Sequence, residues 1–320
     1  MTLSLRLGRG ETPGWIYSPA TPGFFFTGGY CCKLATAKFT VLGGVRQGAI
    51  PIANAEQFSE ETWSVLTPVP SPARSQAAGA SYRGAGLHIG GTFTSPPYFS
   101  SQVDRLWQGT WNVETSLPAP RYAHAAASVG DAVYVVGGRD EQQQTVDTLF
   151  EYRDGTWTTK TPQPGGGRAF GNAVAFGGGF VSVGGIQSTG GLPTETLLFN
   201  SGQNVWTTRA ALPGGGRHSA AGFPQDSAVI LVGGTKGSGL LSSETLTFTG
   251  DTWAGGAPLT TPPRSNFSGA GLGSTGHVAG GINPSLSVLN QHQSLRDSTW
   301  TLRTPLLNPA RYQHVTCPSF

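Results

Sequence analysis

The stretch Arg121–Trp157, RYAHAAASVGDAVYVVGGRDEQQQTVDTLFEYRDGTW, decides the fold. It opens with an arginine and a run of small residues, turns, and continues into the apolar run AVYVV, which stops at Gly137 and Gly138. A polar loop, a second alternating run, a tight Asp-Gly turn and Trp157 complete the stretch. Short apolar or alternating runs bounded by Gly and Asp turns are typical of consecutive antiparallel strands.

Three markers of this stretch recur in register along the chain. A pair of glycines recurs six times, at Gly43, Gly44, Gly90, Gly91, Gly137, Gly138, Gly184, Gly185, Gly233, Gly234, Gly280 and Gly281. A tryptophan follows 20 to 22 residues after the start of each pair, at Trp63, Trp111, Trp157, Trp206, Trp253 and Trp300. An arginine follows 10 or 11 residues later, at Arg74, Arg121, Arg168, Arg217, Arg264 and Arg311. Such a fixed period indicates stacked copies of one supersecondary unit.

A period near 50 residues, built from four strands, is typical of one blade of a Kelch-type propeller. Through its glycine pairs, its downstream tryptophans and its Pro/Gly-x-Arg turns, the sequence resembles the Kelch-repeat family over nearly its whole length. The resemblance implies an all-β propeller. It implies no particular activity, because function lies in sites that differ among proteins of one fold.

The number of blades follows from a count of strands, named a to d from the propeller axis outward. Cutting the chain at each arginine gives six repeat units, 27–73, 74–120, 121–167, 168–216, 217–263 and 264–310. In the remnant 1–26, the run TLSLRL matches strand c and Trp15 matches the tryptophan of strand d. In the remnant 311–320, VTCPSF matches strand a. The count is then seven a, six b, seven c and seven d strands.

We therefore predict one domain over residues 1–320, an all-β, seven-bladed Kelch-like propeller. Its closing blade would combine residues 1–26 with residues 311–320, so that both ends of the chain share one sheet and no sheet edge stays open. These 36 residues are 11 short of a repeat unit. One strand of that blade would be missing or supplied by a neighbouring subunit. A six-bladed ring with loose ends is the alternative.

The recurring residue types fit this architecture. Strand a consists mostly of small residues, because the innermost strands converge on the axis. Strand b is apolar throughout, because both faces of a blade are covered. The glycine pair carries no Cβ atoms and leaves a surface for an aromatic ring. We expect the tryptophan of each unit to cover that surface.

Composition excludes several classes of partner and cofactor. The net charge is +3 without any run of Lys or Arg, which argues against nucleic acid and against an anionic membrane surface. Three cysteines, Cys31, Cys32 and Cys317, are too few for a disulfide framework. The N-terminus lacks the apolar core of a signal peptide, so we expect synthesis in the cytoplasm. Only 12% of the residues are charged, about half the usual share, which would also suit a virion or another large assembly.

The six arginines are the strongest candidates for ligand binding. Each precedes an innermost strand, so the sequence predicts a ring of guanidinium groups at one end of the central channel. Guanidinium groups suit carboxylates, phosphates and sugar hydroxyls. In Kelch proteins that capture acidic peptides, arginines of this face bind the ligand, and the resemblance implies the same here. The neighbouring candidates are Tyr122, His124, His218, Tyr312 and His314. The competing interpretation is that each arginine braces its loop by bonding carbonyls of a neighbouring blade.

The functional hypothesis is a non-enzymatic module that binds a protein or glycan at the channel mouth and its loops. The acidic residues fall in turns away from the channel, so we predict no catalytic residues, no metal and no cofactor. A structural subunit of a virion or surface appendage is one alternative. A carbohydrate-active enzyme, similar to a sugar oxidase or a sialate epimerase, is another. Tyr312, His314 and Cys317 come nearest to a metal site for such an enzyme.

Overall fold

The computed structural model describes residues 2–5, 15–18, 38–70 and 72–319, and its regular elements within these ranges are β-strands. The described part of the chain contains no helix with the length and apolarity that a membrane crossing requires. The chain divides into two compact units, Met1–Ala35 and Thr36–Phe320, where the sequence predicted one domain. In the first unit, β1 (Thr2–Leu5) and β2 (Trp15–Ser18) form a two-stranded antiparallel sheet.

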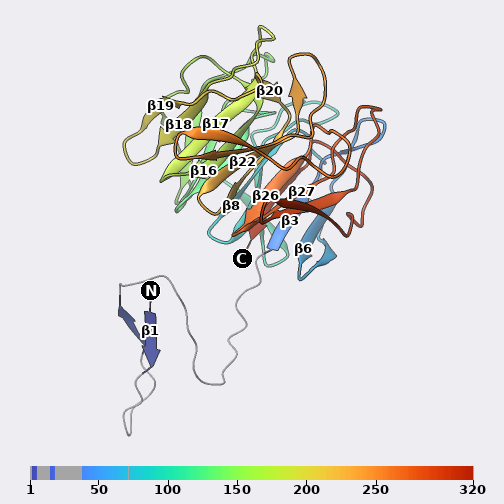
Figure 1. The fold of residues 1–320 in the computed structure, drawn as a ribbon. Helices are drawn as coiled ribbons and strands as arrows, with labels where there is room; N and C mark the ends of the chain where they lie inside the picture. Colours follow the sequence, from blue (N-terminus) through green and yellow to red (C-terminus); the bar gives the residue numbers. More distant parts are fainter. Residues whose placement is uncertain (1, 6–14, 19–37, 71, 320) are drawn as a thin grey trace. The chain divides into compact units, whose positions relative to one another are not determined.

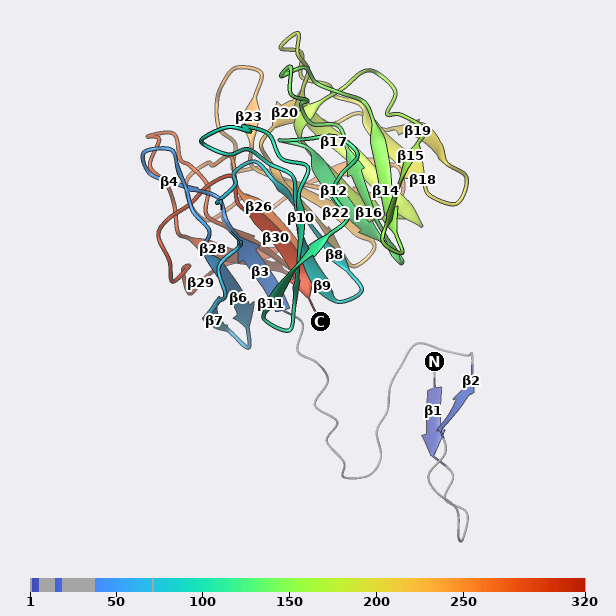
Figure 2. The same ribbon diagram turned by 180° about the vertical axis from the view of Figure 1, so that it is seen from behind.

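Six four-stranded antiparallel sheets form the blades of the second unit (Figures 1 and 2). Blade 1 consists of β8 (Ala78–Tyr82), β9 (Ala85–Ile89), β10 (Val103–Trp107) and β11 (Thr110–Glu114). Blade 2 consists of β12 (Ala125–Val129), β13 (Ala132–Val136), β14 (Leu149–Arg153) and β15 (Thr156–Lys160). Blade 3 consists of β16 (Ala169–Phe176), β17 (Gly179–Ile186), β18 (Thr196–Asn200) and β19 (Val205–Arg209).

The remaining blades follow the same plan. Blade 4 consists of β21 (Ala221–Gln225), β22 (Ala228–Val232), β24 (Thr245–Thr249) and β25 (Thr252–Gly256). Blade 5 consists of β26 (Ser268–Leu272), β27 (Thr275–Ala279), β28 (His292–Arg296) and β29 (Thr299–Arg303). Blade 6 consists of β30 (Val315–Ser319), β3 (Lys38–Leu42), β6 (Ala55–Ser59) and β7 (Thr62–Leu66). The innermost strands β8, β12, β16, β21, β26 and β30 each pack beside the next, and β30 packs beside β8. The ring is therefore closed by six blades.

The prediction of seven blades is wrong, and the alternative of six gives the correct number. The strand count placed an innermost strand at the start of the unit 27–73, in residues that lie outside the described ones. In the structure β30 takes that place and pairs with β3 from Leu42↔Val315 to Lys38↔Ser319. Figure 2 shows β30 beside β3. Pairing the C-terminal strand with β3 removes the free edge that β3 would otherwise present.

The composition predicted for the closing blade is also corrected. β1 and β2 do pair with each other, but in a sheet of their own outside the propeller unit. Blade 6 contains four strands, so it lacks no strand that a partner could supply. Its strands b, c and d come from the repeat unit 27–73, and only strand a comes from the C-terminal remnant.

The antiparallel order within each blade gives the propeller two faces. The b–c loops and the d–a segments lie at one end of the strands, which we call the upper face. The a–b and c–d turns lie at the other end, the lower face. Two small two-stranded sheets lie on this face. In the b–c loop of blade 6, β4 (Val45–Arg46) pairs with β5 (Ile50–Pro51), and β20 (Arg217–His218) of the d–a segment pairs with β23 (Thr235–Lys236) of the b–c loop of blade 4. Figure 2 shows β4 and β23 on the same side of the propeller.

The core lies between neighbouring blades. All five residues of β13 are buried. On one face of this strand, Tyr134 packs against Phe180 and Phe199 of blade 3, with ring centroids 5.5 and 5.6 Å apart. The continuous apolar run of strand b thus reflects coverage on both faces.

Each repeat tryptophan links two blades at their outer strands. Its Nε1–H donates to the carbonyl of the residue that follows strand d of the preceding blade. The distances are 2.9 Å for Trp111 to Thr67, 2.8 Å for Trp157 to Thr115, 2.9 Å for Trp206 to Thr161, 3.2 Å for Trp253 to Ala210 and 3.1 Å for Trp300 to Ala257. Trp63 donates to Thr304 at 2.8 Å and so joins blade 6 to blade 5. The side chain of Trp15 lies outside the described residues, as do Cys31 and Cys32.

The glycine pairs are therefore not covered by tryptophan, and that expectation is wrong. Both glycines of each pair have positive φ. A Cβ atom on Gly137 would lie 2.5 Å from the main-chain oxygen of Arg168 in the next blade. The N–H of Gly138 donates to that same oxygen at 3.0 Å. The pair is glycine because the backbone of the next blade approaches it directly.

In three blades an aromatic ring does lie against the first glycine of the pair. That ring belongs to the residue three positions after the arginine of the following blade. His124 lies against Gly90, Phe267 against Gly233 and His314 against Gly280, each within 2.9 Å of where a Cβ atom would stand.

Candidate functional site

The six repeat arginines are buried, and five of them donate to the backbone of their own blade, whereas Arg121 donates to the Thr148 hydroxyl at 2.8 Å. Arg74 is an example: its Nη1 donates to the carbonyls of Gly90 at 3.1 Å and Gln102 at 2.9 Å. The same bond to the first glycine of the pair recurs from Arg217 to Gly233 at 3.3 Å, from Arg264 to Gly280 at 3.0 Å and from Arg311 to Gly43 at 3.4 Å. Each arginine thus ties the start of strand a to the b–c loop.

The arginines differ in the acids that face them. Arg74 pairs with Asp104 and Arg311 with Glu56, and both pairs are completely buried. Arg217 pairs with the half-exposed Glu244 at 2.8 Å. Arg264 instead donates to the uncharged amide oxygen of Gln291 at 2.7 Å. Burial lowers the pKa of Arg264 to about 10. Burial also lowers the pKa of Arg74 and Arg311, although their carboxylate partners act in the opposite direction.

The predicted ring of guanidinium groups at the channel mouth is therefore wrong. The repeat arginines expose 5% or less of their surface and do not line the channel. Their contacts fit the competing interpretation, in which each arginine braces its loop. The carbonyls that they bond, however, belong to their own blade and not to a neighbouring one. The reason is steric: the innermost strands converge, so a long side chain at their start fits only behind them, against strands b and c.

The channel is lined by four consecutive residues from the start of each innermost strand, and it encloses a cavity of about 170 Å³. Its rim consists of the residue two positions after each arginine, namely Gln76, Ala123, Phe170, Ser219, Asn266 and Gln313. All six have positive φ, between 52° and 56°. Five main-chain hydrogen bonds of 2.8 or 2.9 Å connect them in sequence, each N–H donating to the rim residue of the preceding blade.

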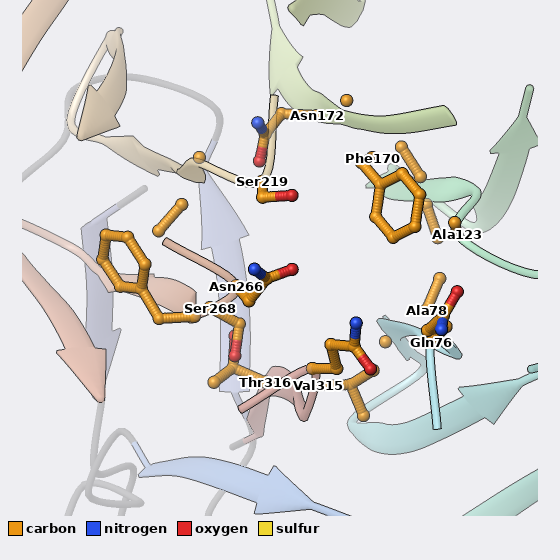
Figure 3. A pocket seen from close by; sticks show the side chains of 18 of the residues that line it. Gln76, Ala78, Ala123, Phe170, Asn172, Ser219, Asn266, Ser268, Val315 and Thr316 are labelled. Atoms are coloured by element: carbon orange, nitrogen blue, oxygen red, sulfur yellow. The ribbon is translucent and has the colours of Figure 1, made fainter. Parts of the chain in front are cut away.

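The lining combines small apolar residues with uncharged polar side chains and carries no formal charge at neutral pH. None of its residues is Asp, Glu, Lys or Arg. His124 and His314 also line it, and burial lowers the pKa of each to about 3, so both are neutral. Figure 3 shows the Ser219 hydroxyl and the Asn266 amide directed toward the middle of the cavity, with the Phe170 ring across from them.

Six buried atoms of the lining residues lack a hydrogen-bond partner among the described residues. They are Gln76 Oε1, Ser268 Oγ and both ring nitrogens of His124 and His314. Buried polar atoms are normally hydrogen-bonded, so a partner from outside the chain or a water molecule is expected here. The cavity can therefore accept an uncharged group that donates and accepts hydrogen bonds.

The other predicted site residues lie apart from the cavity. Tyr122 is buried and stacks on Phe99 of the neighbouring b–c loop, with ring centroids 5.3 Å apart. His218 is half-buried, and burial lowers its pKa. Tyr312 pairs through its backbone with Val45. Of the eleven predicted ligand-binding residues, only His124 and His314 line the channel.

Sequence reasoning missed most of the lining, including Gln76, Ser219, Asn266, Ser268 and Gln313. A signal for the rim was present, because its six residues all stand two positions after an arginine. Their identities differ from blade to blade, so they do not appear as a repeat.

The residues proposed for a metal site are not assembled into one. His314 and Cys317 are both buried, and burial raises the pKa of the Cys317 thiol to about 12. Among the described residues, no three His, Cys, Asp or Glu side chains lie close enough together to hold a metal ion.

The tips of the b–c loops on the upper face divide the ring into two parts. In blades 4, 5, 6 and 1, the tips carry exposed apolar side chains, namely Leu240 (69% exposed), Leu286 (71%), Ile50 (46%) and Tyr98 (53%). We call these four residues the apolar tips. In blades 2 and 3 the tips are polar, with the sequences DEQQQ at 140–144 and QSTGG at 187–191. The apolar tips therefore lie on four consecutive blades.

Comparison with known proteins agrees with this fold. A Kelch motif matches residues 120–162, which include all four strands of blade 2. The solved structure of YjhT is similar with a TM-score of 0.70 at 14% sequence identity, covering 82% of this chain and 97% of that one. No curated protein matches the sequence. The glycine pairs, the linking tryptophans and the six closed blades show that the chain is a Kelch-repeat β-propeller.

Proposed function

We propose that this propeller is a non-enzymatic interaction module and that it binds a protein partner on its upper face. Kelch propellers are generally protein-interaction modules. The observation that carries the proposal is the set of apolar tips, Leu240, Leu286, Ile50 and Tyr98. Four large apolar side chains held in water on consecutive loops are typical of an interaction surface and have no role in the propeller core.

The channel mouth supports the same proposal. Its cavity of about 170 Å³ is smaller than the ~300–1,000 Å³ of typical small-molecule sites, so it suits one side chain better than a whole substrate. The buried Gln76 Oε1 and Ser268 Oγ would bond an uncharged polar side chain of the partner. The apolar tips would supply most of the binding free energy, and the channel would fix the orientation.

A glycan is the second candidate ligand for this face. The observation that favours it is the uncharged amide and hydroxyl lining of the channel, which matches the hydrogen-bonding groups of a sugar.

The apolar tips can be tested by changing them together. A variant with Ile50, Tyr98, Leu240 and Leu286 replaced by serine is used as bait beside the wild type in extracts of the source cells. The matched control replaces Val65, Val113 and Leu302, which are exposed apolar residues on outer strands of the same propeller. We expect a partner that the wild type and the control retain and that the tip variant loses.

Equal retention by all three baits would contradict the proposal. Light scattering tests the hypothesis that the chain is a subunit of a larger assembly. Self-association that the tip substitutions abolish would identify a second copy of this chain as the partner. A glycan array probed with the same three proteins, together with Ser268→Ala, tests the second candidate.

A further inference from the structure

Trp107 stands outside the set of six repeat tryptophans that link the blades. The six repeat tryptophans donate hydrogen bonds between blades, whereas Trp107, the last residue of β10, is 38% exposed. In the other five blades the last residue of strand c is polar. These residues are Ser59, Arg153, Asn200, Thr249 and Arg296. The symmetry of the repeat is thus broken by an exposed indole in blade 1 alone.

Trp107 lines a cavity of about 250 Å³ at the seam between blades 6 and 1. Blade 6 contributes Lys38, Thr40 and Gln57, and blade 1 contributes Gly84 and the c–d turn that follows Trp107. Blade 6 contains the C-terminal strand β30. Blade 1 is the first blade whose four strands follow one another in the sequence. The cavity reaches the lower-face turns, at the opposite end of the strands from the apolar tips.

The indole is held in place from two directions. A Cβ atom on Gly84 would lie 3.0 Å from Cζ3 of Trp107, and Gly84 has a φ of +78°. The Arg105 guanidinium lies 5.7 Å from the ring centroid, within the range of a cation–π contact. Arg105 in turn pairs with Glu114 at 3.5 Å. These contacts limit the motion of the ring, so less side-chain entropy is lost when a ligand stacks on it.

We propose that this cavity binds a pyranose unit of an oligosaccharide. The C–H face of a pyranose can bury its apolar surface on an indole ring. The groups around the indole match sugar hydroxyls: Lys38 donates, the Thr40 hydroxyl donates and accepts, and the amides of Gln57 and Gln108 do both. An apolar ligand fits less well, because only Leu66, Leu106 and the indole offer apolar side chains. This site is independent of the function proposed for the upper face.

The test uses the full chain with ¹⁵N-labelled indole groups. The Nε1–H signal of Trp107 is assigned by its loss in Trp107→Phe, and the wild type is titrated with trisaccharides of glucose, galactose, mannose and N-acetylglucosamine. We expect at least one trisaccharide to shift this signal in a saturable way. By isothermal titration calorimetry, which does not need the indole signal, Trp107→Ala should weaken that binding about tenfold or more, whereas Trp107→Phe, which keeps a ring, should weaken it less.

The control variant is Leu302→Ala, which removes an exposed apolar side chain from the outer wall of blade 5 and should bind as the wild type does. Circular dichroism melts verify that each variant is folded. Should Trp107→Ala not fold, the comparison between Trp107→Phe and the wild type decides. The proposal is overturned if no trisaccharide shifts the Trp107 signal, or if the variants at position 107 bind as tightly as the wild type. A protein partner that needs Trp107 in the absence of sugar binding would likewise overturn it.

Discussion

Arg74 and Arg264 occupy the same place in blades 1 and 5, yet they face different partners. Arg74 pairs with the buried carboxylate of Asp104, and Arg264 with the neutral amide of Gln291. The repeated arginine is visible in the sequence, but its burial is not. The sequence places each arginine at the start of an innermost strand, and only the packing behind that strand decides whether a guanidinium faces the channel or the blade.

These two arginines predict different costs of substitution. Arg74→Met leaves the Asp104 carboxylate buried without its cation, which typically costs about 3–5 kcal/mol of unfolding free energy. Arg264→Met leaves only neutral groups without a donor, for which about 1–3 kcal/mol is usual. Urea unfolding at pH 7 should therefore show the larger loss for Arg74→Met.

The pH dependence of the unfolding free energy of the same variants tests whether the buried Asp104 carboxylate causes the larger loss. Burial raises the pKa of Asp104, and loss of the cation beside it removes an opposing influence. Acidification should therefore protonate Asp104 and reduce the deficit of Arg74→Met relative to the wild type. A deficit that is equal in the two variants, or independent of pH in Arg74→Met, would show that charge burial is not the cause.

At the scale of elements, most of the strands could be predicted and the closing strand was misassigned. Glycine pairs, tryptophans and arginines locate strands b, d and a within each repeat, because each marker has a fixed steric role there. Strand a is a short run of small residues, and such a run carries little information about its partner. The count therefore took the start of the unit 27–73 and the run VTCPSF as strands a of two different blades, whereas β30 pairs with β3 and is strand a of the blade that the unit 27–73 supplies.

The two ends of the chain should differ in importance. Removal of residues 315–320 takes away β30 and leaves β3 as an unpaired edge, so we expect self-association and a lower melting temperature. Removal of residues 1–35 leaves all six blades complete, so the melting temperature of the propeller should change by no more than a few degrees. Differential scanning calorimetry and light scattering on both truncated proteins measure this.

A propeller that loses stability after removal of residues 1–35, as the seven-bladed arrangement required, would contradict the closure by β30. A fully stable, monomeric protein without residues 315–320 would contradict it equally.

At the scale of the whole molecule, buried neutral histidines make folding depend on pH. Burial lowers the pKa to about 4 for His277 and to about 3 for His124, His292 and His314. In the unfolded chain these groups titrate near pH 6.5, so the unfolded state binds more protons below that pH. The contribution of these neutral histidines to the free energy of unfolding is complete above pH 6.5. It is lost as the pH falls toward their pKa values in the folded state.

We therefore expect the urea midpoint to be nearly constant from pH 8 to 7 and to fall between about pH 6 and 4.5. Each histidine contributes a slope of up to ~1.4 kcal/mol per pH unit in this range. The chain supplies its own control, because Phe267 occupies in blade 5 the position that His124 and His314 occupy in blades 2 and 6. The double variant His124→Phe, His314→Phe should have a shallower slope, and an unchanged slope would refute this account.

The pairing of β3 with β30 also has a consequence for biosynthesis. β3 ends at Leu42, and its partner begins at Val315. A ribosome that adds about 5–20 residues per second needs roughly 15–55 s to make the intervening chain. During that time the first blade to emerge lacks its innermost strand, and the ring can close only after β30 has been made. Nascent chains of this protein are therefore exposed to misassembly throughout the synthesis of residues 43–314.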